Sequence, residues 1–161
     1  MLAELRIVNF ALIEQLSLQF QSGFTVLTGE TGAGKSLLID AITLLVGGRA
    51  STDQIRSGED EALLEAAFHL SDTHPLLQRL RLREIIGQNE SELILRRVLS
   101  RSGRHRAYVN GSLCPQRELE ELGGTLVDIH GQHEHLHFDD FMQFRLRSLN
   151  LRPARSGHAL A

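Results

Sequence analysis

Eight consecutive residues, from Gly29 to Ser36, have the types and spacing of a phosphate-binding loop. They match the pattern of glycine, any four residues, glycine, lysine and then serine or threonine. The glycines let the backbone bend so that successive N–H groups point inward at phosphate oxygens. Lys35 can reach the β- and γ-phosphates, and the Ser36 hydroxyl can bind Mg²⁺. The pattern therefore predicts that ATP with Mg²⁺ binds at Gly29, Glu30, Thr31, Gly32, Ala33, Gly34, Lys35, Ser36 and Leu37.

Lys35 is the only lysine among the 17 lysine and arginine residues of the chain. An ammonium on a slim, flexible stem fits a nest of backbone amides, whereas a planar guanidinium is wider. The bias toward arginine thus stops at the one position where a phosphate loop needs lysine.

The elements around the loop fit this role. Residues 24–28 are a short β-rich run before the first glycine. The apolar run from Leu37 to Val46, stopped by Gly47-Gly48, predicts a helix that is buried on most sides. Its free amides and positive dipole end would face the phosphates. Elsewhere, alternation and turn residues predict strands at 5–10, 16–20, 62–70 and 125–129, a hairpin of 93–99 and 105–109, and helices after 75, at 116–122 and at 138–149.

Composition sets the wider bounds. The chain has 161 residues, 42% of them apolar, which suits one core of ordinary size. A formal charge of -3 gives no overall attraction to DNA. The single cysteine, Cys114, excludes an internal disulfide and fits a reducing cytosol. Because no run approaches the roughly 20 apolar residues of a membrane span, and no signal-peptide pattern is present, we expect a soluble cytoplasmic protein.

An arginine-rich patch lies on or beside the predicted hairpin, with no acid between its members. It could hold a DNA backbone by neutralising phosphates, without reading sequence. The alternative is a solvated edge hairpin whose charges prevent aggregation. Alternating strand positions face opposite ways, so all members cannot meet one partner. The patch consists of Arg96, Arg97, Arg101, Arg104, His105 and Arg106.

Two further groups near the end of the chain are candidates for chemistry. Asp128 follows an apolar pair, so it could be the Mg²⁺-organising aspartate of a small self-sufficient P-loop kinase. A zinc site is conceivable in the cluster that follows, although alternate histidines of an extended segment suit a metal poorly. The alternative for that cluster is a set of partly exposed polar residues. It comprises His130, His133, Glu134, His135 and His137.

Five segments carry a family resemblance: Ile7–Glu14, Val26–Ser36, Ile39–Ala41, Gly47–Ala50 and Val127–His135. They closely resemble the RecN family of bacterial double-strand-break repair ATPases, which are related to SMC proteins. The resemblance covers residues 1–145 and implies an α/β fold, namely the P-loop lobe of an ABC/SMC-type ATPase head with an antiparallel β-subdomain contributed by the N-terminal strands. It also implies that Gln132 reaches Mg²⁺ and the attacking water, and that Arg56 lies near the nucleotide and DNA.

The same resemblance implies partners: a coiled coil, a C-terminal lobe that completes the head, a second head that closes on ATP, and DNA on the nucleoid. The chain departs from the family because it has no Leu-Ser-Gly-Gly signature, no later Asp-Glu strand, no switch histidine and no heptads after residue 145. We therefore expect an N-terminal half-head with a divergent or truncated tail at 146–161, shortened by design or in nature, with little ATPase activity alone. The alternatives are the kinase or a nucleotide-binding module without catalysis.

Overall fold

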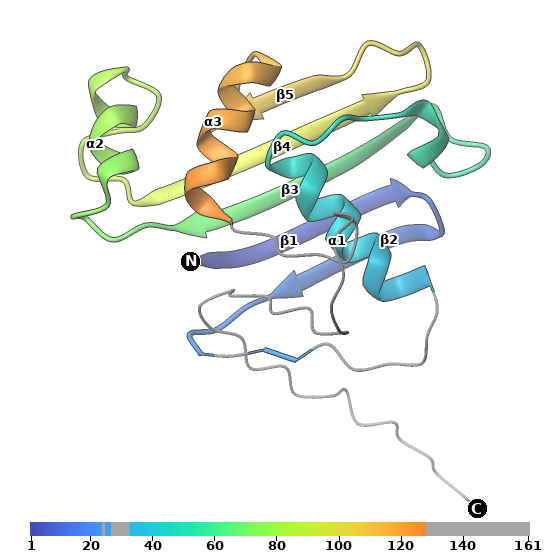
Figure 1. The fold of residues 1–161 in the computed structure, drawn as a ribbon, viewed down its shortest axis with the longest axis horizontal. Coiled ribbons are helices and arrows are strands. Elements are labelled where there is room, and N and C mark those ends of the chain that lie inside the picture. Colours follow the sequence, from blue (N-terminus) through green and yellow to red (C-terminus); the bar gives the residue numbers. More distant parts are fainter. Residues whose placement is uncertain (24, 27–32, 128–161) are drawn as a thin grey trace, which may run out of the picture.

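A computed structural model describes residues 1–23, 25–26 and 33–127 of the chain. Helices α1 and α3 lie over one face of an antiparallel sheet, and α2 lies beside one end of that sheet (Figure 1). The elements are β1 (Leu2–Phe10), β2 (Ile13–Gln19), α1 (Ala33–Leu45), the 3-10 helix η1 (Thr52–Gln54), β3 (Glu61–His69), α2 (Pro75–Leu82), β4 (Glu92–Ser100), β5 (Arg106–Val109), β6 (Ser112–Leu113) and α3 (Gln116–Leu126).

The sheet has the strand order β2-β1-β3-β4-β5-β6, and every neighbouring pair is antiparallel. This confirms the strands predicted at 5–10, 16–20 and 62–70, and the hairpin of 93–99 and 105–109. The antiparallel part is wider than expected, because four strands beyond the N-terminal pair join it. The Asn110-Gly111 turn into β6 has positive φ angles of 45° and 82°, which asparagine and glycine tolerate best.

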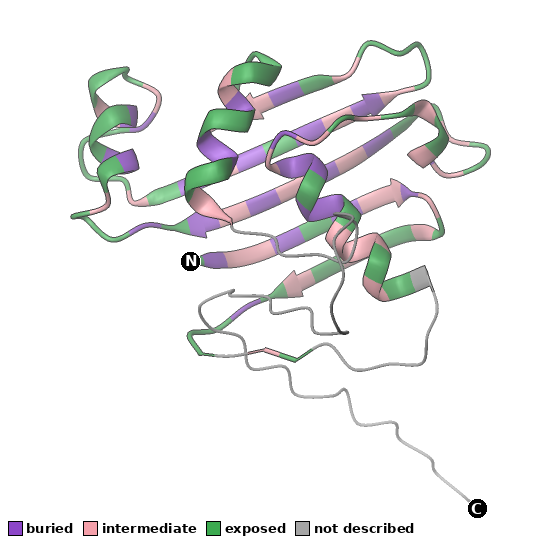
Figure 2. Ribbon diagram, in the orientation of Figure 1, coloured by how far each residue is buried: buried purple, intermediate pink, exposed green. Residues whose placement is uncertain are grey.

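The core fills the space between the sheet and α1 and α3. Alternate residues of β3 and β4 point toward these helices, so every second residue in the middle of each strand is buried (Figure 2). Apolar burial of this kind is the main favourable term in folding. The most completely buried residues of this core include Leu5, Ile7, Phe10, Leu45, Leu64, Leu93, Leu95, Leu99 and Leu119.

Helix α1 confirms the helix predicted after the phosphate loop, but the prediction that it is buried on most sides is wrong, because Ser36, Asp40 and Thr43 are exposed. Its buried residues, Ala41, Ile42, Leu44 and Leu45, lie in its C-terminal half, whereas Leu37 and Leu38 are only partly covered. The chain leaves the helix at Gly47, whose φ of 108° favours glycine.

The predicted end of α3 is wrong. The predicted helix ends at residue 122 and the predicted strand begins at 125, but α3 continues through both glycines to Leu126. Gly123 serves close packing instead, because a Cβ there would lie 2.2 Å from the carbonyl oxygen of Val46. The helix predicted at 138–149 lies outside the described residues.

Candidate nucleotide-binding site

The phosphate-loop pattern runs into the start of α1. Its first four residues, Gly29 to Gly32, lie outside the described part of the chain. The helix begins at Ala33, so Lys35 and Ser36 lie in its first turn. The amides of a first turn have no partner within the helix, and this turn carries no acidic residue that would repel an anion. This end of α1 is therefore suited to a phosphate group.

The β1–β2 turn and η1 lie toward the same end of the sheet as the start of α1 (Figure 1). In this turn Asn9 and Ala11 have left-handed φ angles of 53° and 49°. Two backbone hydrogen bonds hold the turn in this conformation: Ala11 N donates to Gln54 O at 2.8 Å, and Arg56 N donates to Asn9 O at 2.9 Å. A non-glycine residue keeps such a conformation only where its surroundings enforce it.

Arg56 is the residue that ties this turn to the segment after η1. Its Nη1 donates to Leu12 O at 3.0 Å, and its Nη2 lies 3.7 Å from the Glu14 carboxylate. The side chain is 34% exposed. Within the described residues Arg56 thus holds the β1–β2 turn, and its role toward the nucleotide stays a prediction.

The predicted DNA role of Arg97 is wrong. Its position on β4 points toward the helices, and only 4% of the residue is exposed. Its Nη1 donates to Leu44 O and to Gly48 O, each at 2.7 Å, and its Nη2 donates to Gln116 Oε1 at 2.7 Å. Burial lowers its pKa and the Glu120 carboxylate opposes this shift, but a guanidinium stays charged in proteins. Arg97 is therefore part of the core.

The other hairpin arginines differ in what they contact. On the face opposite the helices, Arg96 Nε lies 2.5 Å from Glu65 Oε2, and Arg106 Nη2 lies 2.7 Å from Glu61 Oε1. The β3 strand thus supplies acids that the hairpin itself lacks. Arg101 donates to two backbone carbonyls, those of Glu59 and Arg56. Arg104 is exposed, and it makes no hydrogen bond or ion pair within the described part of the chain.

A polar cleft lies where the end of α1, the start of α3 and the β4–β5 turn meet. Burial, and secondly the charge of Arg97, lower the pKa of His105. Arg49 and Gln116 also line this cleft, although the sequence did not indicate a role for them. Gln116 reaches Arg97 only because Arg97 points inward from β4 and the start of α3 lies close to it. The cleft is lined by Arg49, Ala50, Arg97, Gly103, His105, Gln116 and Glu120.

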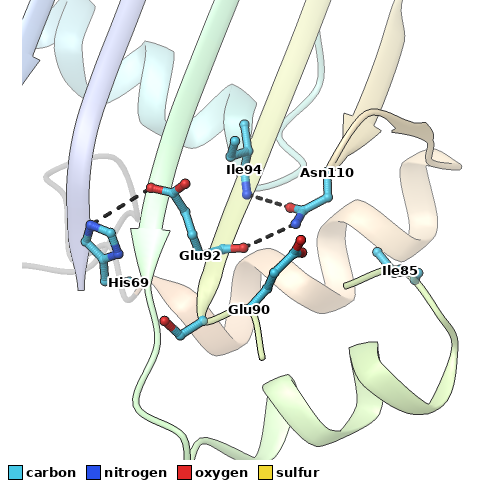
Figure 3. Close-up of a pocket in the computed structure, with 7 residues that line it drawn as sticks. His69, Ile85, Glu90, Glu92, Ile94 and Asn110 are labelled. Carbon is cyan, nitrogen blue, oxygen red and sulfur yellow. Dashed lines mark hydrogen bonds and ion pairs between the residues drawn. The ribbon is translucent and has the colours of Figure 1, made fainter. Parts of the chain in front are cut away.

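A second pocket lies at the other end of β3 and β4, beside α2 (Figure 3). Asn110 Oδ1 accepts from Ile94 N at 2.7 Å, and Asn110 Nδ2 donates to Glu92 O at 3.2 Å. His69 Nε2 lies 3.9 Å from Glu92 Oε1. The Asn110 bonds therefore hold the end of β5 against the start of β4, and the His69–Glu92 pair joins β3 to β4. No group of three metal-ligating side chains occurs among the described residues.

Several predicted residues lie outside the described ranges. These are the loop residues Glu30 and Thr31 with their glycines, and the candidates Asp128, Gln132 and the histidine cluster. Cys114 is buried, and burial raises its pKa to about 11. Among the helices that the structure describes, none has the length and apolar character that a membrane span requires.

The chain belongs to the AAA domain family, whose pattern matches residues 4–144. Its fold is that of SMC-type ATPase heads. The SMC head domain from Thermotoga maritima superimposes with a TM-score of 0.57 at 24% identity, over 75% of this chain and 41% of that one. The recombination mediator RecF gives a TM-score of 0.58 at 21% identity, over 74% and 29%.

The resemblance to the RecN proteins is also confirmed. The DNA repair protein RecN of Bacillus subtilis is 51% identical over 134 residues, which are 83% of this chain and 23% of that protein. RecN of Vibrio cholerae is 45% identical over 84% of this chain and 24% of its own length. The chain therefore spans about a quarter of the length of the curated relatives it matches.

Proposed function

We propose that the chain is the phosphate-loop half of the ATPase head of a RecN-like DNA repair protein, and that it binds ATP with Mg²⁺. Residues 1–145 would form this lobe, and 146–161 a tail. The observation that carries the proposal is the start of α1 inside the Gly29–Ser36 pattern, which puts Lys35 and Ser36 in the first turn. Lys35 would bind the β- and γ-phosphates, and Ser36 would bind Mg²⁺, with the amides of Ser36 and Leu37 facing the phosphates.

Hydrolysis would need parts beyond this chain: a C-terminal lobe, a coiled coil that joins the lobes, and a second head closed across ATP. The chain covers about a quarter of its RecN relatives, and ATP-driven dimerisation is described for SMC ATPases of similar fold. Gln132 would orient Mg²⁺ and the attacking water in the completed head. The chain alone would bind nucleotide with little turnover.

DNA would be contacted by the β4–β5 turn of the assembled protein, in the cytoplasm and on the nucleoid. We propose Arg104 and Arg101 as the residues that make this contact. Arg104 is exposed and makes no bond within the described part, and Arg101 lies beside it. Arg96 and Arg106 would first have to leave their glutamate partners. Such contacts would neutralise phosphates without reading sequence.

Titration of the chain with a fluorescent ATP analogue in Mg²⁺ tests the central claim. We expect Lys35→Ala to weaken binding about 10- to 150-fold, the effect of one charge-assisted hydrogen bond of ~1.5–3 kcal/mol. Lys35→Arg should also weaken it, because the wider guanidinium does not fit the amide nest. Arg79→Ala, which removes an exposed charge on α2, is the control. Equal affinity in all four proteins would show that the loop does not hold the nucleotide.

A second measurement tests completion of the head. Co-expression with a C-terminal lobe from a RecN relative should produce ATP hydrolysis, and Gln132→Ala should remove it. Steady turnover by the chain alone, lost on Asp128→Asn, would instead identify a self-sufficient kinase. Binding without turnover in any pairing would identify a nucleotide-binding module.

A further inference from the structure

Arg97 is the one buried charged residue among the described ranges. Within those ranges no carboxylate lies at ion-pair distance from it. Its partners are instead the carbonyl oxygens of Leu44 and Gly48 and the amide oxygen of Gln116. The last carbonyls of a helix lack partners within it and carry the negative end of its dipole. The guanidinium therefore caps the C-terminal end of α1 by both hydrogen bonds and charge.

Gln116, the first residue of α3, completes this cap. Its Nε2 donates to Gly47 O, and also to Glu120 Oε1 at 3.1 Å. One amide side chain thus accepts from Arg97 and donates to the turn that ends α1. A lysine at position 97 could not reproduce the fork, because an ammonium is a single point donor on a flexible stem.

The backbones of α1 and α3 also approach closely where this cap lies. A Cβ on Gly47 would lie 2.6 Å from Glu120 Cα, and a Cβ on Gly123 would lie 2.6 Å from Val46 Cα. Two glycines on opposite sides of one contact leave little room for α1 to slide or rotate. The arginine, the glutamine and the glycine contacts therefore fix one end of α1.

We propose that Arg97 is a positioning residue for the phosphate loop: it fixes the C-terminal end of α1 against α3, and so sets where the first turn presents its amides. This inference rests on the ATP binding proposed above. A helix rises about 1.5 Å per residue, so Lys35 lies roughly 14 Å along the axis from Leu44. A tilt of about 10° at the clamp would then move the first turn by about 2 Å, and displacements of about 1 Å already weaken precise contacts.

The test measures ATP affinity against stability in five proteins: wild type, Arg97→Met, Arg97→Lys, Gln116→Ala and Leu93→Ala. Leu93 is the matched control, because it is fully buried on the same face of β4 but at the end beside α2. Each protein is melted first, and affinity for the fluorescent ATP analogue is measured where all are folded. The full chain is used throughout.

We expect Arg97→Met to weaken ATP binding about tenfold, or about 1.4 kcal/mol. The ATP affinity of Arg97→Lys should lie between those of Arg97→Met and wild type, and Gln116→Ala should weaken ATP binding a few-fold. Leu93→Ala should lower the melting temperature but keep wild-type affinity. If Arg97→Met does not fold, Arg97→Lys and the exposed Gln116→Ala carry the comparison.

Wild-type affinity in the Arg97 and Gln116 variants would overturn the positioning role, as would an equal loss of affinity in Leu93→Ala. If the wild-type chain itself binds no ATP, the proposed function fails and this inference falls with it. The wild-type titration therefore distinguishes the two failures.

Discussion

Two neighbouring glycines of α3 should respond in opposite directions to the same substitution. An added methyl group at Gly123 would meet Val46 O at 2.2 Å and Val46 Cβ at 2.5 Å, and one of these atoms belongs to the backbone. At Gly124 the same methyl group would have no atom within 4 Å. To relieve the clash of this methyl group with Val46, α3 would have to move away from the end of α1.

The expected magnitudes follow from these distances. Overpacking in a core costs typically ~1–3 kcal/mol, so Gly123→Ala should lower the free energy of unfolding by about that amount. Replacing glycine by alanine in an open helical position stabilises by ~0.5–1 kcal/mol, so Gly124→Ala should raise it. At this chain length each kcal/mol shifts Tm by about 2–4 °C.

Urea unfolding followed by far-UV circular dichroism measures both changes, and unchanged m-values would show that the comparison is two-state. A stability gain for Gly123→Ala, or changes of the same sign in the two variants, would refute the close approach of α3 to α1. The extension of α3 through Gly124 would be refuted if Gly124→Ala destabilised the protein.

Two further predictions concern single side chains. Cys114, which is 7% exposed and has a pKa raised to about 11, should react slowly with a thiol reagent at pH 8 and rapidly once urea unfolds the chain. Equally fast labelling with and without urea would contradict the burial. Because the pKa of Cys114 in the folded chain exceeds the ordinary 9.0, the thiol of the unfolded chain loses its proton at lower pH. The contribution of Cys114 to the free energy of unfolding should therefore decline as pH rises from about 9 to 11. In the assembled protein, Arg104→Gln should lower the slope of log affinity for DNA against log salt by about 1, whereas Arg79→Gln, the same charge change on α2, should not. An unchanged slope for Arg104→Gln would remove the β4–β5 turn from the DNA path.

Much of the fold could be predicted because the relevant signals are local. Alternating leucines mark β4, the Asn110-Gly111 pair marks a tight turn, and the apolar run after Lys35 marks α1. The end of α3 could not be predicted, because a glycine that stops a helix and a glycine that admits a neighbouring backbone look the same in sequence. Only the position of Val46 in space distinguishes them.

In the candidate site, too, one part could be predicted from neighbouring residues and another part depends on residues far apart in the sequence. The phosphate loop is defined by eight consecutive residues, so its pattern can be recognised in the sequence alone. The arginine patch depends on distant partners: Glu65 is 31 residues from Arg96, and Glu61 is 45 residues from Arg106. Whether Arg97 points in or out depends on which face of β4 is buried, and the sequence leaves this open because apolar residues occur at both alternations of the strand.

The ion pairs on the helix-free face of the sheet have a consequence for how a polyanion approaches the protein. By register, this face of β1, β3, β4 and β5 carries four glutamates and three arginines, Glu4, Glu61, Glu65, Glu92, Arg6, Arg96 and Arg106. Half-exposed pairs contribute only ~0–1 kcal/mol each to stability, but their fields largely cancel beyond a Debye length of ~8 Å at physiological salt. The broad face therefore carries little net charge, so among the described residues of the sheet the attraction for an incoming strand would come from the tip of the β4–β5 turn rather than from the flat of the sheet.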